Sequence, residues 1–216
     1  GIDNIRFDIN TNDFVTLDVE AGTVHVNNQA IASTNFLNVE SFFTTKNDDF
    51  LYGSSLKDTL RAGNGNDYLE GKDGNDILDG DPGDDILFGQ NGNDSLIGDF
   101  GDDILYGGDG LDQLHGGGGA DTFIFEQISA FNDIDKVLDF DTSENDIINI
   151  ADMLSQYDPL SDSISDFVQI TSDTSHSYLE VDVDGGADNF IKIVEFTNNN
   201  AINDAATLEA NGNLII

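Results

Sequence analysis

Apolar residues in the middle of the chain recur every nine positions, and glycine and aspartate recur with them. Across residues 62–124, seven consecutive nonapeptides each carry Gly at position four, Asp at position six and Leu or Phe at position eight. Two weaker nonapeptides precede them and keep only the Asp and the Leu. In order, the rungs read TTKNDDFLY (44–52), GSSLKDTLR (53–61), AGNGNDYLE (62–70), GKDGNDILD (71–79), GDPGDDILF (80–88), GQNGNDSLI (89–97), GDFGDDILY (98–106), GGDGLDQLH (107–115) and GGGGADTFI (116–124). A strict period of this length predicts a solenoid in which each rung stacks on its neighbours.

Two rungs, or 18 residues, close one coil of the predicted solenoid. Each rung supplies six turn-forming residues and a three-residue strand at positions seven to nine. Because the chain returns to the same edge after two rungs, alternate rungs build alternate parallel sheets, with neighbouring strands about 4.8 Å apart. Strand side chains alternate in direction, so position eight points inward and positions seven and nine point outward. The predicted fold class is therefore all-β, with a thin core of one large apolar residue per rung.

The outward positions differ between the two predicted sheets. The sheet built from the rungs that start at 44, 62, 80, 98 and 116 is almost wholly apolar on its outer face. Its outward residues are Phe50, Tyr52, Tyr68, Glu70, Ile86, Phe88, Ile104, Tyr106, Thr122 and Ile124. The other sheet presents a mixed set: Thr59, Arg61, Ile77, Asp79, Ser95, Ile97, Gln113 and His115. Because a bare apolar stripe is a liability in a soluble protein, we expect residues 125–216 to fold back over the apolar face.

Charge adds the next constraint. The 216 residues include 43 Asp and Glu against 7 Lys and Arg, which gives a formal charge of −36. Such a chain lacks the cations that displace counterions from nucleic acid, and an anionic membrane surface repels it. Hydrophobic residues still make up 38%, with 15 Phe, so a core is expected rather than disorder. There is no Cys for a disulfide or a thiolate metal site, and no apolar run is long enough to insert in a membrane.

The position-six aspartates need a cation. Asp67 and Asp85 are 18 residues apart, so they lie one above the other on one edge, as Asp76 and Asp94 do on the opposite edge. Stacked carboxylates repel by roughly 1 kcal/mol per near pair even in water. Ca²⁺ takes about six to eight oxygen ligands, so it converts this repulsion into coordination when backbone carbonyls complete its shell. Gly at positions one and four lets the turn bend tightly and aim those carbonyls.

These nonapeptides resemble the RTX (repeats-in-toxin) family, whose repeat is G-G-x-G-x-D-x-U-x. The resemblance covers residues 62–124 well and 44–61 in degenerate form. It implies a right-handed, calcium-bound parallel β-roll in which each ion takes two Asp carboxylates from successive turns on one edge. About five calcium ions follow, at Asp67/Asp85, Asp76/Asp94, Asp85/Asp103, Asp94/Asp112 and Asp103/Asp121. We leave out a sixth pair, Asp58/Asp76, because Leu56 replaces the turn glycine and Lys57 adjoins Asp58.

Turn carbonyls complete the sites that the resemblance implies. Successive carbonyls alternate in direction, so we assign positions two and four to the ion on one side and positions one and three to the ion on the other. The candidate carbonyl ligands are Gly63, Gly65, Lys72, Gly74, Gly80, Asp81, Pro82, Gly83, Gly89, Gln90, Asn91, Gly92, Gly98, Asp99, Phe100, Gly101, Gly107, Asp109, Gly116 and Gly118. The alternative, that these Asp and Gly residues only make turns, does not account for identity at two positions in all seven rungs.

The regions on either side of the repeats have the patterns of β-strands. Residues 1–43 are predicted to be an N-terminal lead-in or cap, 44–124 the β-roll, and 125–216 a C-terminal cap. The N-terminal region alternates over 14–26 around a turn at Ala21-Gly22, and 36–43 resembles a first rung. The C-terminal region has a short helix predicted at 150–155, strand-like runs at 167–171 and 177–196, and a hairpin turn at Asp184-Gly185-Gly186.

The C-terminal region also resembles the end of RTX proteins that leave bacteria by type I secretion. The matching segments are Ala120–Phe125, Asp133–Phe140 and the closing Leu214–Ile216, although Lys136-Val137 lengthens the second motif. The resemblance implies an uncleaved export signal near the end of the chain. The alternative is a region that only caps the open end of the solenoid, and the two roles are compatible.

No catalytic motif is found in the sequence. The three histidines, His25, His115 and His176, do not form H-E-x-x-H, and there is no G-x-S-x-G elbow. His115 stands at position nine of its rung, where a solvated sheet residue is expected. The acids Asp182, Asp184 and Asp188 lack the Glu that closes an EF-hand loop, so they are read as part of a turn. We therefore predict no enzyme activity.

Three functional hypotheses remain for this sequence. The first is a calcium-triggered folding and export module at the end of a large bacterial adhesin, with the type I secretion machinery as its partner. The second places the same module behind a catalytic domain such as a protease, lipase or epimerase, and the third is a carbohydrate-binding solenoid. All three predict a secreted, extracellular or cell-surface protein, and we expect a monomer that binds neither nucleic acid nor membranes. The abrupt start at Gly1 indicates a fragment of a longer chain.

Overall fold

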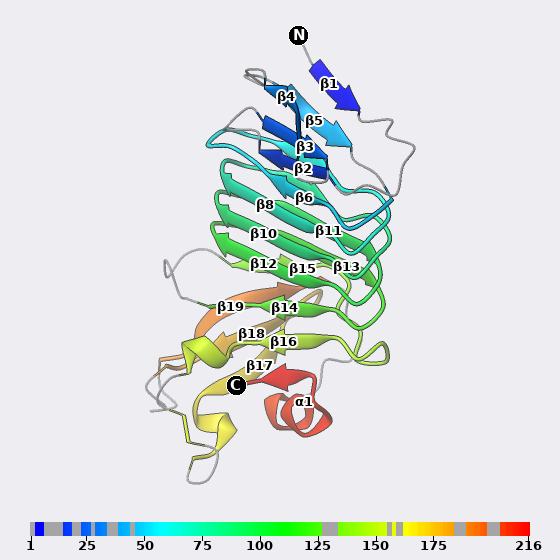
Figure 1. Cartoon of the computed structure of the whole chain (residues 1–216). Helices are drawn as coiled ribbons and strands as arrows, with labels where there is room; N and C mark the ends of the chain where they lie inside the picture. The colour runs from blue at the N-terminus through cyan, green and yellow to red at the C-terminus, as the bar shows by residue number, and fades with distance from the viewer. Residues whose placement is uncertain are drawn as a thin grey trace.

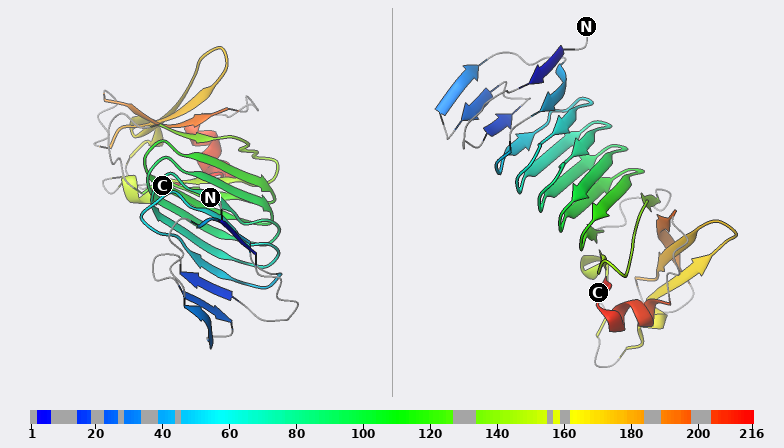
Figure 2. Two further views of the ribbon diagram at one scale, coloured as in Figure 1. Left: turned by 90° about the horizontal axis from the view of Figure 1, so that it is seen from above. Right: turned by 90° about the vertical axis from the view of Figure 1, so that its right-hand side faces the viewer.

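The computed structural model of the chain describes residues 3–6, 15–18, 23–26, 29–33, 39–43, 46–126, 134–154, 157–158, 162–183, 189–197 and 204–216. Within these ranges nearly all regular structure is β-strand. The strands stack along one axis, with the N-terminus at one end of the stack and the C-terminal elements at the other (Figure 1). Seen from two further sides, the middle of the stack consists of regular coils (Figure 2).

The described strands form two ten-stranded sheets. Sheet A contains, in spatial order, β1 (Asp3–Arg6), β5 (Val39–Phe43), β7 (Thr59–Arg61), β9 (Ile77–Asp79), β11 (Ser95–Phe100), β13 (Gln113–Gly118), β15 (Asp135–Val137), β19 (Ile191–Phe196), β18 (Ser177–Val181) and β17 (Val168–Ser172). Sheet B contains β20 (Leu214–Ile215), β16 (Ile147–Asn149), β14 (Thr122–Ile124), β12 (Ile104–Asp109), β10 (Ile86–Asn91), β8 (Tyr68–Asp73), β6 (Phe50–Tyr52), β2 (Val15–Asp18), β3 (Thr23–Val26) and β4 (Gln29–Ser33). Alternate rungs fall on alternate sheets, so the fold is the all-β parallel β-roll that the period predicted.

The pairing register follows the 18-residue coil. Leu69 of β8 lies opposite Leu87 of β10, and Leu87 lies opposite Leu105 of β12, all in parallel strands. The position-eight residues are all fully buried, at 0% exposure: Leu51, Leu60, Leu69, Leu78, Leu87, Leu96, Leu105, Leu114 and Phe123. The inward direction predicted for position eight is therefore confirmed, and these side chains form a continuous core between the two sheets.

Five strands are longer than the three residues predicted. β8, β10, β11, β12 and β13 each span six residues, from position seven of one rung through position three of the next. The reason is that turn residues also pair between coils. For example, the Gly83 N–H donates to the Phe100 carbonyl at 2.8 Å, and the Gly92 N–H donates to the Asp109 carbonyl at 2.8 Å. The first half of each of these turns therefore belongs to the parallel ladder.

The N-terminal strands extend both sheets. β5 pairs in parallel with β7 and places Phe42 opposite Leu60, which makes β5 the lead-in rung. β2 and β3 pair antiparallel. β2 also joins the roll beside β6, where Leu17 lies opposite Leu51 and is fully buried. The predicted turn at Ala21-Gly22 lies outside the described residues.

The C-terminal strands stack on the other end of the roll. β15 and then β19 extend sheet A beyond β13, and β16 and then β20 extend sheet B beyond β14. β19, β18 and β17 form the antiparallel arrangement expected from the strand-like runs. The predicted hairpin turn at Asp184-Gly185-Gly186 lies outside the described residues. The core continues through this region, because Phe140 contacts both Phe123 and Phe196.

Helical structure in the described part of the C-terminal region is limited to three short elements. They are the 3₁₀ turns η1 (Ala151–Met153) and η2 (Ile164–Asp166) and the helix α1 (Ala205–Asn211). The helix predicted at 150–155 is thus only the single turn η1. α1 was not predicted, although its signals are present: the Asp204 side chain accepts the Thr207 N–H, and Gly212 ends the helix with a left-handed φ of 81°.

The described residues of the C-terminal region do not fold back along the outer face of sheet B as expected, and only its end is reached, where Glu126 and Asp152 lie near Tyr106. That region lengthens the stack instead, because its strands find unpaired backbone groups at the edges of β13 and β14. The outward aromatic residues pack on one another: the rings of Tyr68 and Phe88 are 5.5 Å apart, and those of Phe88 and Tyr106 are stacked at 4.3 Å. The division at residue 124 stays a prediction, since the ladder crosses it without a break.

Candidate calcium-binding turns

The position-six aspartates form two columns, one on each edge of the roll. Each stands directly before a strand, and its own carbonyl accepts the N–H that begins the corresponding strand one coil later, as Asp67 does from Ile86 at 2.9 Å. The predicted carboxylate ligands are each no more than 2% exposed: Asp67, Asp76, Asp85, Asp94, Asp103, Asp112 and Asp121. Seven buried carboxylates in two rows require compensation from hydrogen bonds or cations.

One oxygen of each carboxylate is held by a hydrogen bond between coils. The Oδ1 atom of Asp85 accepts the backbone N–H of Asp67 at 2.7 Å, and Oδ1 of Asp94 accepts the N–H of Asp76 at 2.8 Å. The same bond joins Asp49 to Asp67, Asp58 to Asp76, Asp85 to Asp103, Asp94 to Asp112, and Asp103 to Asp121. Each aspartate therefore points its Oδ1 atom back toward the preceding coil of its own edge.

The second carboxylate oxygen, Oδ2, has no hydrogen-bond donor in the middle of each column. The Oδ2 atoms of five aspartates are buried and accept no hydrogen bond: those of Asp67, Asp76, Asp85, Asp94 and Asp103. A buried carboxylate oxygen without a donor costs about 1–3 kcal/mol, and more when it carries charge. Five such atoms in two regular rows are therefore a donor set that fits a cation, and the hard oxygen chemistry fits Ca²⁺.

In six of the seven rungs a position-one glycine makes the room that the Oδ2 atom occupies, and in the rung of Asp67 position one is Ala62. A Cβ atom on Gly80 would lie 2.2 Å from Oδ2 of Asp85, and one on Gly98 would lie 2.1 Å from Oδ2 of Asp103. These glycines do not have a left-handed φ, so their role is close approach rather than bending. The turn bends at positions two and four, which have positive φ in all seven rungs. At position four the φ values lie between 131° and 153°, and at position two they lie between 62° and 106°.

The turn carbonyls point in alternating directions. Those at positions two and four lie against the following coil, as shown by Gln90 O beside Gly108 and Gly65 O beside Gly83. Those at position one lie against the preceding coil. Position-three carbonyls face the same way and already accept a hydrogen bond, since Pro82 O takes the Gly65 N–H at 3.1 Å. Because a carbonyl has two lone pairs, position three keeps one acceptor site for a cation.

Burial strongly raises the pKa of six position-six carboxyls, those of Asp67, Asp76, Asp85, Asp94, Asp103 and Asp121. Desolvation is the largest cause in each, and neighbouring carboxylates add to it in several. The pKa rises to about 8 for Asp67, to about 7 for Asp85 and to about 6 for Asp94. Without a metal, the carboxylates are therefore poorly stabilised as anions near neutral pH. A divalent cation beside them would stabilise the anionic form.

At the N-terminal end of one column, the protein supplies a donor itself. Oδ2 of Asp58 accepts the Ser54 backbone N–H at 2.7 Å and the Ser54 hydroxyl at 2.9 Å. The preceding Gly53 keeps room for this oxygen, as position-one glycine does elsewhere. The serine thus occupies the free oxygen of Asp58, and this contact adds a physical reason to the sequence argument against an Asp58/Asp76 site.

At the C-terminal end, aspartates from the flanking region continue both columns. Asp135 accepts the Asp112 N–H at 3.0 Å, and Asp146 accepts the Asp121 N–H at 3.1 Å. The second oxygen of Asp146 accepts the Asp141 N–H at 2.8 Å. Asp139 accepts the N–H groups of Gly116 and Gly117, which caps the last turn. Sequence reasoning missed these residues because their spacing from the last rungs is no longer 18.

A second side-chain ladder runs along position five and was also missed. Asn66 Oδ1 accepts the Asp84 N–H at 3.1 Å, and Asp84 Oδ1 accepts the Asp102 N–H at 3.0 Å. This ladder points toward the following coil, opposite to the ladder at position six. It ends where Leu111 and Ala120 stand at position five, because neither side chain has an acceptor. The signal in the sequence was the repeated Asn or Asp before the invariant Asp.

In the part of the chain that the structure describes, no three His, Cys, Asp or Glu side chains converge to hold one metal ion. Ions in the turns would therefore depend on pairs of carboxylates and on carbonyls. His115 lies on the outer face of sheet A, 3.2 Å from Asp139. Asp182 is buried, while Asp184 and Asp188 lie outside the described residues.

Comparison with known proteins agrees with this geometry. Residues 52–87 and 88–123 each match the family model for the RTX calcium-binding nonapeptide repeat (four copies). No curated protein sequence matches the chain. Among solved structures, the solution structure of the AlgE6R3 subunit from the Azotobacter vinelandii mannuronan C5-epimerase is similar, with 24% identity, 80% of each chain covered and a TM-score of 0.31. Residues 52–123 therefore match the RTX class of calcium-binding repeat, and the structure shows that they fold as a parallel β-roll.

No helix in the described ranges has the length and apolar character needed to cross a membrane.

Proposed function

We propose that the position-six aspartates hold about five calcium ions in two columns. The observation that carries this proposal is the row of buried Oδ2 atoms that accept no hydrogen bond. The proposed pairs are Asp67/Asp85, Asp76/Asp94, Asp85/Asp103, Asp94/Asp112 and Asp103/Asp121. Carbonyls at positions one, two and four are the preferred additional ligands, and position-three carbonyls contribute their remaining lone pair.

Calcium in these turns would act on folding. A metal-free roll has to bury like-charged carboxylates around a core of one Leu per rung, and the chain carries a charge of −36. Extracellular calcium modules bind at about 10⁻⁴–10⁻³ M, well above the concentration inside cells. The chain is therefore expected to be largely unfolded before secretion and to fold when it meets calcium outside.

Circular dichroism of the full chain in chelator and then in millimolar calcium tests this proposal. We expect the strand signal to appear with calcium and to rise cooperatively, because neighbouring ions share aspartates. Magnesium at the same concentration is the control, since Mg²⁺ demands a tighter octahedral shell. A strand signal that chelator leaves unchanged would contradict calcium-dependent folding.

The larger context we propose is a type I-secreted bacterial adhesin whose end this module forms. Supporting this is the resemblance of Ala120–Phe125, Asp133–Phe140 and Leu214–Ile216 to the C-terminal motifs of such exported proteins. An RTX module behind a protease, lipase or epimerase domain would carry the same repeats. The sequence of the full gene product separates these contexts, since a catalytic domain in it would contradict the adhesin.

Export can be tested with two deletions of equal length. In bacteria that carry a type I exporter, removing residues 174–216 should abolish appearance of the chain in the medium. Removing residues 1–43 should leave export largely intact, since the export motifs lie at the other end. Equal export of the two deletion variants would rule out a C-terminal signal, whatever the outcome of the calcium experiment.

A further inference from the structure

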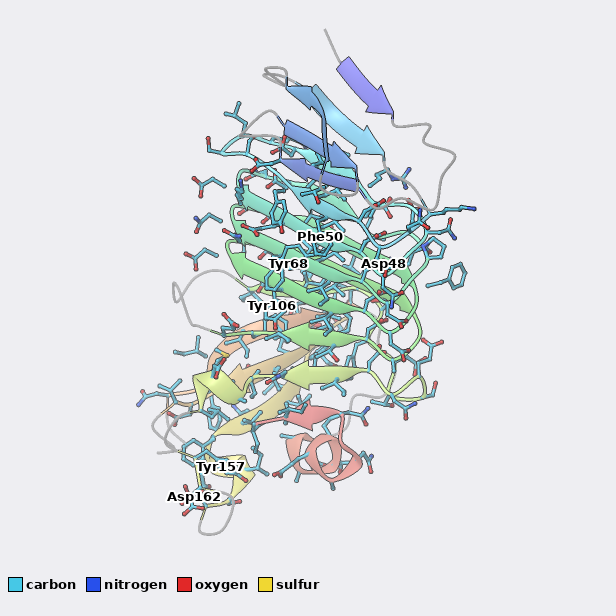
Figure 3. The ribbon with its side chains drawn as sticks, viewed as in Figure 1. Asp48, Phe50, Tyr68, Tyr106, Tyr157 and Asp162 are labelled. Carbon is cyan, nitrogen blue, oxygen red and sulfur yellow. The ribbon has the colours of Figure 1, made fainter. Side chains whose placement is uncertain are left out.

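The outer face of sheet B ends in a pocket beside the turns, and the backbone carbonyls of Gln90 and Asp109 in its lining are also candidate calcium ligands. None of its side chains is among the proposed carboxylate ligands of calcium. Aromatic residues run down this face, and Figure 3 shows Phe50, Tyr68 and Tyr106 one below another along it. Where the run ends, the structure has a pocket of about 500 Å³. This volume is within the range of small-molecule sites in proteins, which is about 300–1,000 Å³.

The pocket has an aromatic wall. Phe88 and Tyr106 form part of its lining, and their rings are stacked at 4.3 Å with an interplanar angle of 16°. Phe125, which follows β14, also lines it. The faces of aromatic rings carry partial negative charge and attract organic cations. The lining is thus suited to a ligand with an apolar body and a positive charge.

The remaining polar lining is strongly acidic. Asp109, Glu126 and Asp152 contribute to it, and none of the described lining residues is Lys, Arg or His. The charges of Glu126 and Asp152 help to raise the pKa of Tyr106, after the larger effect of its burial, so both carboxylates lie near the phenol. The described lysines with printed partners are engaged elsewhere, for example Lys136 with Glu195 and Lys192 over the Tyr178 ring.

A metal ion does not explain this arrangement. No three acidic or histidine side chains in the described ranges converge closely enough to bind one ion. The lining instead combines acidic residues with aromatic ones. We propose that this pocket binds a small organic cation, an alkyl- or arylammonium whose apolar body lies against Phe88, Tyr106 and Phe125 while its charge faces Glu126 and Asp152.

Titration of the full chain with benzylammonium, followed by NMR in saturating calcium, tests this inference. The expected result is saturable shifts of the Tyr106 and Phe125 resonances. Benzyl alcohol is the neutral probe of nearly the same shape and should bind at least about five-fold more weakly, since it lacks the cation. Equal binding of the two probes, or no saturable shift with either, would overturn the proposal.

Two variants and one control identify the pocket. Asp152→Asn and Tyr106→Leu should each weaken benzylammonium binding by about two- to five-fold. Asp166→Asn is the matched control, because Asp166 is an exposed acid in η2 just as Asp152 is in η1. A similar loss with Asp166→Asn would show only general attraction to the negative chain and would overturn the site. The site would also be overturned if further calcium displaced benzylammonium in proportion to the calcium added.

Should Tyr106→Leu fail to fold, as judged by circular dichroism, Asp152→Asn still decides the outcome because its side chain is exposed. This result does not depend on the calcium scheme in the turns. Benzylammonium binding could fail while calcium-dependent folding succeeds, or the reverse, so the two proposals are tested separately.

Discussion

At the scale of single residues, the two oxygens of each position-six carboxylate have different tasks. Oδ1 takes part in the protein's own hydrogen-bond ladder, for example between Asp94 and the N–H of Asp76. Oδ2 lies beside a glycine and accepts no bond in the central turns. A substitution that keeps the ladder bond but removes the charge therefore separates folding geometry from calcium binding. Asn in place of Asp is such a substitution.

Asp94→Asn should reduce calcium-dependent stability more than Asp67→Asn. In the proposed columns Asp94 serves two ions and Asp67 serves one. If each lost carboxylate–ion contact costs about 1.5–3 kcal/mol, the scale of a charge-assisted hydrogen bond, the first variant should lose roughly twice as much. Thermal melts at a fixed calcium concentration measure the difference.

The control for this pair is Asp166→Asn, since Asp166 is an exposed acid in η2, outside the roll. Its melting temperature should match that of the unmodified chain. Equal losses for Asp94→Asn and Asp67→Asn, or a greater loss for Asp67→Asn, would argue against shared ions within a column.

At the scale of elements, the repeat made the roll predictable. The constant spacing fixed which residues stack, so the buried Leu column and the alternation of sheets followed from the period alone. The length of the strands did not follow, because turn composition gave no sign that positions one to three join the ladder. The glycines at positions one and four were also read alike, although position one provides space for Oδ2 in six of the seven rungs and position four provides a left-handed φ.

The C-terminal elements were harder to predict for a physical reason. Their placement depends on pairing over irregular distances: Val137 aligns with Leu114, and Ile148 aligns with Phe123. No periodic signal records such spacings. The prediction of a covering cap relied on the apolar face of sheet B, but the open ends of the ladder also needed partners. In the structure, β15 and β16 pair with the open backbone edges of β13 and β14. The aromatic side chains on the outer face of sheet B pack against each other.

At the scale of the whole molecule, the buried carboxyls make the metal-free and calcium-bound chains respond oppositely to pH. The folded pKa values of Asp67, Asp85, Asp103 and Asp146 are about 8, 7, 7 and 6, against an ordinary value of 3.8. Without calcium, the folded roll therefore binds more protons than the unfolded chain between about pH 4 and 8. Its stability must rise as pH falls through that window.

Calcium binding depends on pH in the opposite direction and weakens as the pH falls, because the carboxylate ligands must be deprotonated. We expect the strand signal in chelator to be greater at pH 5 than at pH 8, while the calcium concentration needed for half-maximal folding is higher at pH 5. Surface acids do not interfere, since Asp141, Asp173 and Asp204 have lowered pKa values and lose their stabilising effect only at more acid pH. Circular dichroism at the two pH values, with and without calcium, measures both trends. A metal-free chain that gains strand as pH rises would show that the columns do not bury their carboxyls as the structure places them.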